Sequence, residues 1–252
     1  MQNKDLDNLR EPFSIYNPDF PRGRALWLDK SFRDAKAAFP VIKQTEEYLP
    51  RDLNTHIFSG QEEIDRLWSS YKDHGYGFFL YSLVKVLQVK VCVELGVLQG
   101  FSLLTVASAL RNNGKGIICG FDLFENYPYR NETFDNLNHR ITEFGLNTWA
   151  SVEMMDAFQV HKFFNKKVDY LHVDLSNDGD IYRKIFKQWA KKVQKVILLE
   201  GGSPARDQVS WMIKYNKPSI HGVLQELKDC YGDWDIVVLN PFPSLTVALR
   251  RS

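Results

Sequence analysis

Short apolar runs alternate with helical patterns from Gly75 to about residue 200. Five of these runs have the length of a strand and are largely apolar, at residues 90–95, 116–121, 151–155, 168–173 and 195–199. Between them, apolar residues recur at helical spacing, as in Leu137, Ile141 and Phe144. Strands that are apolar throughout are typical of parallel strands with two buried faces. The pattern therefore predicts an α/β fold with a Rossmann-like, mainly parallel sheet and helices on both faces.

The last two apolar runs depart from this alternation. Residues 235–239 and 245–249 read as strands, and only five residues, 240–244, separate them. A crossover helix needs a much longer connection, so these two strands are predicted to form an antiparallel hairpin. The whole main domain is thus expected to contain a seven-stranded sheet that ends in a C-terminal antiparallel hairpin.

The first 74 residues have a different pattern. Prolines at positions 12, 18, 21, 40 and 50 divide this segment into short pieces. One helix is indicated by the capping-box spacing of Ser59 and Glu62, followed by Ile64, Leu67 and Tyr71 on one face. We expect residues 1–74 to form a helical N-terminal extension or cap, and residues 75–252 to form the main domain.

Composition excludes several classes of protein. The 32 Lys and Arg residues balance 31 Asp and Glu residues, which gives no general attraction to nucleic acid or to an anionic membrane. The three cysteines form no C-x-x-C pair, as expected for a reducing compartment. The N-terminus lacks the apolar run of a signal peptide, and no segment has the roughly 20 apolar residues of a membrane helix. We expect a cytoplasmic protein without nucleic-acid or membrane partners; a homodimer is left open.

Ligands of open parallel sheets bind beyond the carboxyl ends of the strands, so the residues that end each strand are the candidates for a site. The first strand ends in Glu94 and Gly96, with Gly100 opening the next helix, and glycines there allow close approach of a ligand to backbone amides. Asp122 ends the second strand, where a carboxylate can accept hydrogen bonds from a ribose. Leu123 follows it as an apolar surface for adenine. Asp156 ends the third strand and can accept a hydrogen bond from an exocyclic amine, or simply cap a helix.

These residues carry a resemblance to a known family. The stretch from Val93 to Ser102, with Glu94, Gly96 and Gly100, resembles the first motif of class I methyltransferases that use S-adenosyl-L-methionine (AdoMet). Residues 120–125, Gly-Phe-Asp-Leu-Phe-Glu, resemble a segment of macrocin-type sugar O-methyltransferases, and Asp156-Ala157 is similar to their third motif. The resemblance implies AdoMet as cofactor, with Ser102, Leu123 and Ala157 among its binding residues. It also implies a small-molecule acceptor such as a sugar or a natural product.

Chemistry at an acceptor hydroxyl requires a base or a metal ion beyond the fourth and fifth strands. Asp174 and Glu200 end these strands, and His172 lies two residues before Asp174 on the same side of its strand. Asp174, His172 and Glu200 are the candidate catalytic residues, and Asp174 with Glu200 could hold Mg²⁺. Macrocin-type enzymes are metal-dependent and usually have two adjacent carboxylates after strand five, whereas this chain has Glu200 followed by two glycines.

Three other functions compete with methyl transfer. An NAD-dependent oxidoreductase needs a second glycine in its nucleotide loop, where this chain has Leu98. A different AdoMet reaction, such as cyclisation or elimination, is compatible with the same residues. A binding module without catalysis is less consistent with the acidic residues at three successive strand ends.

Overall fold

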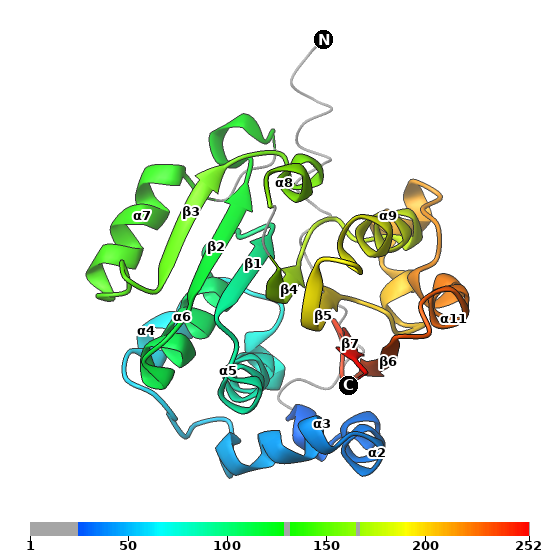
Figure 1. Cartoon of the computed structure of the whole chain (residues 1–252), viewed down its shortest axis with the longest axis horizontal. Coiled ribbons are helices and arrows are strands. Elements are labelled where there is room, and N and C mark those ends of the chain that lie inside the picture. Colours follow the sequence, from blue (N-terminus) through cyan, green and yellow to red (C-terminus); the bar gives the residue numbers. More distant parts are fainter. Residues whose placement is uncertain (1–24, 129–131, 165–166, 252) are drawn as a thin grey trace.

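The computed structural model describes residues 25–128, 132–164 and 167–251. In this part of the chain a seven-stranded sheet lies between two layers of helices, with strand order β3-β2-β1-β4-β5-β7-β6 (Figure 1). The strands are β1 Val91–Leu95, β2 Ile117–Asp122, β3 Ala150–Met154, β4 Val168–Val173, β5 Val193–Glu200, β6 Trp234–Leu239 and β7 Leu245–Arg250.

The pairing of the strands confirms the fold expected from the sequence. Strands β1 to β5 pair in parallel, whereas β7 runs antiparallel to both β5 and β6. The terminal hairpin is present, and its second strand lies between β5 and β6. The strand order reverses between β1 and β4, which places the ligand-binding crevice of such sheets beyond the carboxyl ends of these two strands.

Helices cover both faces of the sheet, with α5 and α6 on one side and α8, α9 and α11 on the other (Figure 1). The helices of the main domain are α5 Tyr76–Leu87, α6 Phe101–Asn113, α7 Phe134–Glu143, α8 Ala157–Phe163, α9 Gly179–Trp189, α10 Ser210–Lys214 and α11 Ile220–Cys230. The short 3₁₀ helices are η2 Leu26–Leu28, η3 Thr45–Tyr48, η4 Lys72–His74, η5 Phe124–Asn126 and η6 Arg206–Gln208.

The described part of the N-terminal extension is helical, with α2 Lys30–Ala38, α3 Pro40–Gln44 and α4 Gln61–Ile64. Part of the expected extension, residues 1–24, lies outside the described residues. The helix predicted from Ser59 to Tyr71 is wrong in its length, because α4 ends at Ile64. Its N-cap is Gly60 at φ +85° rather than Ser59.

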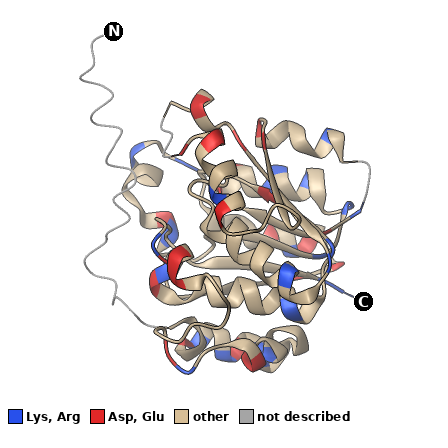
Figure 2. Cartoon of the chain, turned by 90° about the vertical axis from the view of Figure 1, so that its left-hand side faces the viewer, with Lys and Arg blue, Asp and Glu red and all other residues tan. Residues whose placement is uncertain are grey.

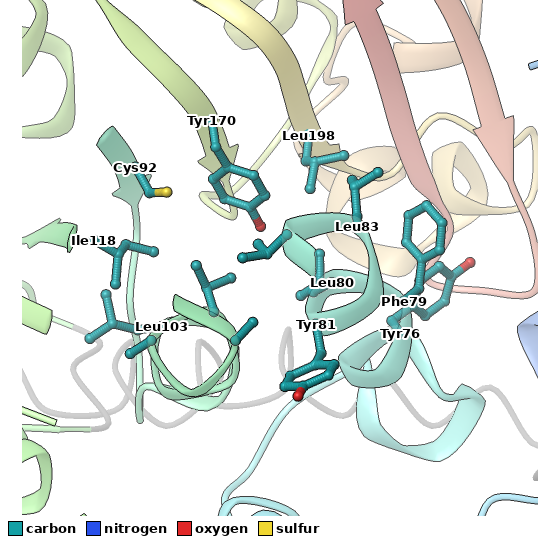
Figure 3. Close-up of a cluster of buried hydrophobic side chains, with 14 of the residues drawn as sticks. Tyr76, Phe79, Leu80, Tyr81, Leu83, Cys92, Leu103, Ile118, Tyr170 and Leu198 are labelled. Atoms are coloured by element: carbon teal, nitrogen blue, oxygen red, sulfur yellow. The ribbon is translucent and has the colours of Figure 1, made fainter. Parts of the chain in front are cut away.

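One hydrophobic cluster joins the extension to the main domain. In Figure 3, Phe79, Leu80 and Leu83 of α5 lie beneath Tyr170 of β4 and Leu198 of β5. The same cluster contains seven buried residues of the extension, namely Leu26, Phe32, Ala35, Ile42, Phe58, Ile64 and Tyr71. Burial of such side chains stabilises by about 1.5–3 kcal/mol each, so the described part of the extension is firmly packed on this face.

The surface agrees with the balanced composition. Figure 2 shows acidic and basic residues interspersed on the side of the molecule in view. Among the described residues, no helix is both long and apolar enough to cross a membrane.

Candidate active site

The loop between β1 and α6 brings the first motif against the end of β4. Gly96 and Gly100 have φ angles of +82° and +88°, which L-residues with a side chain rarely adopt. A Cβ atom on Gly96 would lie 2.2 Å from the backbone oxygen of Asp174. The backbone N–H of Asp174 in turn donates to the oxygen of Leu95 at 2.9 Å. Only glycine at position 96 allows this contact between the loop and the residue that follows β4.

Glu94 lies in β1 with its side chain fully buried. The hydroxyl of Ser102 donates to Oε1 of Glu94 at 2.5 Å. Oε2 of Glu94 has no hydrogen-bond partner among the residues that the structure describes. A buried, unpartnered carboxylate oxygen costs free energy, and a ligand that carries an ammonium group would remove that cost.

His172 links Glu94 to the N-terminal extension. It pairs with Glu94 across β1 and β4, and its Nδ1 lies 3.7 Å from Oε1 of that carboxylate. Its Nε2 lies 3.2 Å from the hydroxyl of Tyr71, a fully buried side chain of the extension. Burial opposes a charge on the imidazole, but Glu94, Asp174 and Glu200 outweigh it and raise the pKa of His172. His172 is thus enclosed, and acts on its neighbours rather than reaching solvent.

Asp122 supports the glycine loop in this structure. Its Oδ2 accepts from the N–H groups of Val97 at 2.7 Å and of Leu98 at 3.3 Å. Its Oδ1 accepts from the N–H groups of Leu123 at 2.7 Å and of Phe124 at 3.2 Å. Because Leu98 has a positive φ of 51°, these bonds hold a loop conformation that the side chain disfavours. The predicted contact of Asp122 with a ribose would have to share oxygens that already bind backbone amides.

Asp156, just after strand β3, caps the helix that follows it. Asp156 accepts from the N–H of Phe158 at 2.9 Å and is the N-cap of α8, which Ala157 begins. Asp178 likewise caps α9, through the N–H of Ile181 at 2.9 Å. Both carboxylates therefore have a structural role, and a role of Asp156 toward a cofactor amine remains a prediction.

Asp174 is the carboxylate that is free to react. Its side chain is half-buried and receives no hydrogen bond or ion pair from another described residue. Burial raises the pKa of Asp174 to about 7, with the negative charge of Glu200 adding to the shift and His172 opposing it. Asn177 fixes the loop that follows, since its amide donates to the oxygens of Val173 at 3.0 Å and Glu200 at 2.9 Å.

Glu200 is already paired, which sequence reasoning did not anticipate. Nε of Arg206 donates to Oε1 of Glu200 at 2.6 Å, and Nη2 donates to Oε2 at 2.9 Å. Both carboxylate oxygens thus face one guanidinium, and the described residues contain no group of three or more His, Cys, Asp or Glu arranged to hold a metal ion. The residues present do not fit the Mg²⁺ site suggested for Asp174 and Glu200.

The structure brings most of the predicted residues together on one side of the sheet. Glu94, His172 and Glu200 belong to the adjacent strands β1, β4 and β5, Asp174 directly follows β4, and the four groups interact electrostatically. Asp122 and Asp156 lie at the ends of the neighbouring strands β2 and β3. Tyr71 and Arg206 were missed. Tyr71 was assigned to an apolar helix face, and Arg206 begins the short helix η6, a segment without a motif.

Comparisons with known proteins agree with this architecture. Residues 93–199 match the family model described as a methyltransferase domain. No curated protein matches the sequence. Among solved structures, an O-methyltransferase from Bacillus cereus in complex with SAH is similar, at 17% identity and a TM-score of 0.59, over 87% of this chain and 100% of that one.

Two further structures extend the comparison. The O-methyltransferase TomG from Streptomyces achromogenes, involved in tomaymycin synthesis and in complex with SAM, has 15% identity and a TM-score of 0.53, covering 89% of this chain and 91% of its own. An SAH-bound methyltransferase from Podospora anserina has 13% identity and a TM-score of 0.53, covering 100% and 98%. At these identities the likeness shows a shared fold. The closer resemblance to macrocin-type enzymes stays a hypothesis.

Proposed function

We propose that this chain methylates a hydroxyl oxygen of a small-molecule acceptor, with Asp174 as the general base. The methyltransferase domain at residues 93–199, within a sheet of the class I methyltransferase type, identifies an AdoMet-dependent methyltransferase. The oxygen acceptor, the small substrate and the role of Asp174 are proposals. They rest on one observation: the glycine loop of the first motif touches the backbone of Asp174 at the switch point of the sheet.

The proposed roles follow from the position of each group. AdoMet, when bound, supplies a methyl group on a positively charged sulfur. Glu94 would attract its ammonium through the unpartnered Oε2, while the hydrogen bond from Ser102 fixes the orientation of that carboxylate and His172 lies beside it. The backbone N–H groups of the first turn of α6 would bind its carboxylate, because those of Gly96, Val97, Leu98 and Gly100 already donate within the protein. Asp174 would take the proton of the acceptor hydroxyl that receives the methyl group.

A sugar or natural product as the acceptor is the finer part of the proposal. The Gly120–Glu125 segment resembles that of sugar O-methyltransferases, and TomG, of similar fold, takes part in tomaymycin synthesis. A screen of sugars and phenols with AdoMet labelled in its methyl group tests this directly. Label transferred to oxygen supports the proposal, whereas label on nitrogen or carbon alone would refute the hydroxyl acceptor.

Replacing Glu94 by Gln is expected to weaken AdoMet binding about tenfold to a hundredfold. The substitution keeps the shape of the side chain but removes the charge that faces the ammonium, and hydrogen bonds to charged groups contribute about 1.5–3 kcal/mol. Isothermal titration calorimetry with AdoMet measures the effect.

Asp169→Asn is the matched control for this experiment. Asp169 also lies in the central sheet, but at the amino end of β4, where its carboxylate accepts from the N–H groups of Lys90 and Val91. Its replacement should leave the affinity within about twofold of the wild type. Equal AdoMet affinity in the wild type and Glu94→Gln would assign the ammonium to another group.

Chelation is expected to leave methyl transfer unchanged. Arg206 occupies both oxygens of Glu200, so Asp174 is the one carboxylate of the suggested pair that is free, which is too few ligands for tight binding of Mg²⁺. Dialysis against EDTA, followed by elemental analysis and a Mg²⁺ titration monitored by thermal unfolding, should detect neither bound metal nor a shift of Tm. Activity that is lost in EDTA and restored by Mg²⁺ would contradict the base mechanism.

A further inference from the structure

The guanidinium of Arg206 is buried, with the residue 5% exposed, and is held on two sides. Glu200 binds its Nε and Nη2 atoms, and the ring of Trp211 lies 5.2 Å from its central carbon. The remaining nitrogen, Nη1, has no hydrogen-bond partner among the described residues. By contrast, the partly buried Arg250 directs its Nη1 to the backbone oxygens of Ala190 and Val193.

The geometry of a guanidinium indicates what Arg206 still offers. Its five N–H bonds lie in one plane, and two edges of that plane can each bind a carboxylate through parallel hydrogen bonds. Glu200 occupies the edge formed by Nε and Nη2. The other edge, formed by Nη1 and the second N–H of Nη2, is not used by any hydrogen bond to a described residue. It is the edge that suits an anionic ligand with two oxygens.

The loop after β5 is built to present this cation. Gly201 and Gly202 have φ angles of +104° and +114°. A Cβ on Gly201 would lie 2.9 Å from Ile220 and 3.3 Å from Cγ of Arg206, and one on Gly202 would lie 2.2 Å from the hydroxyl oxygen of Thr246. A second carboxylate therefore cannot stand directly after Glu200. The turn instead reverses the direction of the chain, so that the side chain of Arg206, six residues after Glu200, contacts the Glu200 carboxylate.

We infer that the free edge of Arg206 binds an anionic oxygen group of the methyl acceptor, which makes a hydroxy acid the substrate class of this enzyme. The inference rests on the proposed function. Asp174 interacts electrostatically with Arg206, so a carboxylate held by the guanidinium places the rest of the acceptor near the base. The guanidinium, which pairs with Glu200, serves in this proposal to orient the substrate.

Binding of small anions to the protein saturated with S-adenosylhomocysteine tests the inference. The probes are acetate, benzoate, phenylacetate and 4-hydroxybenzoate, each paired with its neutral amide, and phenyl phosphate as the second source of anionic oxygen. Calorimetry should detect at least one carboxylate that binds about tenfold or more tightly than its amide. Tighter binding of phenyl phosphate than of every carboxylate would replace the hydroxy acid by a phosphorylated acceptor and overturn the substrate class.

Two variants with opposite expected effects separate this role from a structural one. Arg206→Gln combined with Glu200→Gln removes the ion pair without leaving a buried charge, and should abolish the preference for carboxylate over amide. Glu200→Gln alone frees the guanidinium from its competing carboxylate, and should strengthen carboxylate binding about threefold or more. A purely structural pair would not produce an increase.

The cofactor provides the internal control. S-adenosylhomocysteine affinity is measured in the same samples, and should stay within about twofold of the wild type in both variants. Retained cofactor binding with no anion preference in the wild type would refute the anion site and leave the proposed function intact. A wild-type protein that does not bind S-adenosylhomocysteine would instead refute the proposed function.

Discussion

Replacing Asp174 by Asn is expected to lower the rate of methyl transfer about a hundredfold to ten-thousandfold, the usual contribution of a general base. The amide keeps the size and much of the polarity of the side chain but cannot take a proton. The half-buried carboxylate receives no hydrogen bond or ion pair from another described residue, so its replacement breaks no such contact. Single-turnover rates with labelled AdoMet measure the loss separately from cofactor binding.

The pH dependence of the wild type should report the same group. Burial, with the negative charge of Glu200, raises the pKa of Asp174 to about 7, and only the deprotonated form can act as a base. The rate should therefore rise about tenfold per pH unit below pH 7 and level off above it. Other charges facing this carboxylate belong to His172, Glu94 and Arg206, so the midpoint describes the coupled group.

Asp169→Asn again supplies the comparison, because it changes a carboxylate at the opposite end of β4. This variant should keep both the rate and the pH profile. If Asp174→Asn retained more than about a tenth of the wild-type rate, with the rise near pH 7 unchanged, the base would have to be another residue.

Replacing Gly96 by Ala is expected to lower the free energy of unfolding by about 2–5 kcal/mol and to abolish measurable AdoMet binding. The new Cβ would lie 2.2 Å from the backbone oxygen of Asp174 and 2.9 Å from its carbonyl carbon. Neither atom belongs to a flexible side chain, so the glycine loop must move away from β4. Urea denaturation measures the stability, and calorimetry measures the binding.

Gly145→Ala separates the cost of the steric clash at position 96 from the cost of backbone strain at a positive φ angle. Gly145 also has a positive φ, 62°, but a Cβ there would meet no atom within 4 Å. Its replacement should cost only about 1 kcal/mol and leave AdoMet affinity unchanged. Equal destabilisation by the two substitutions would show that the loop accommodates a methyl group at position 96.

The sheet could be predicted because its signal is local. A run such as residues 168–173, largely apolar and bounded by polar residues, matches β4 residue for residue. The five-residue gap before Leu245 was enough to predict the hairpin. The helix α11, which follows β5 and precedes β6 along the chain, was not identified. Its apolar residues Ile220, Val223, Leu224 and Leu227 nevertheless follow helical spacing.

The site was predictable only as far as strand ends determine it. Parallel strands end at the same edge of a sheet, so Glu94, Asp174 and Glu200 could be placed together from their positions alone. The residues that bind to these groups could not be placed in this way. Tyr71 is 101 residues away from His172 along the chain, and the turn that brings Arg206 to Glu200 depends on tertiary contacts of two glycines. Such contacts determine which carboxylate remains free.

The raised pKa of Asp174 also links protonation to folding. The folded chain keeps a proton on this carboxyl up to about pH 7, whereas the unfolded chain releases it near the ordinary value of 3.8. Since the folded state binds more protons in this interval, the stability contributed by the group is complete below about pH 3.8 and declines as the pH rises to about 7. The ionised form that can accept a proton is therefore the form that destabilises the fold, and the packing of buried side chains elsewhere in the protein offsets that loss.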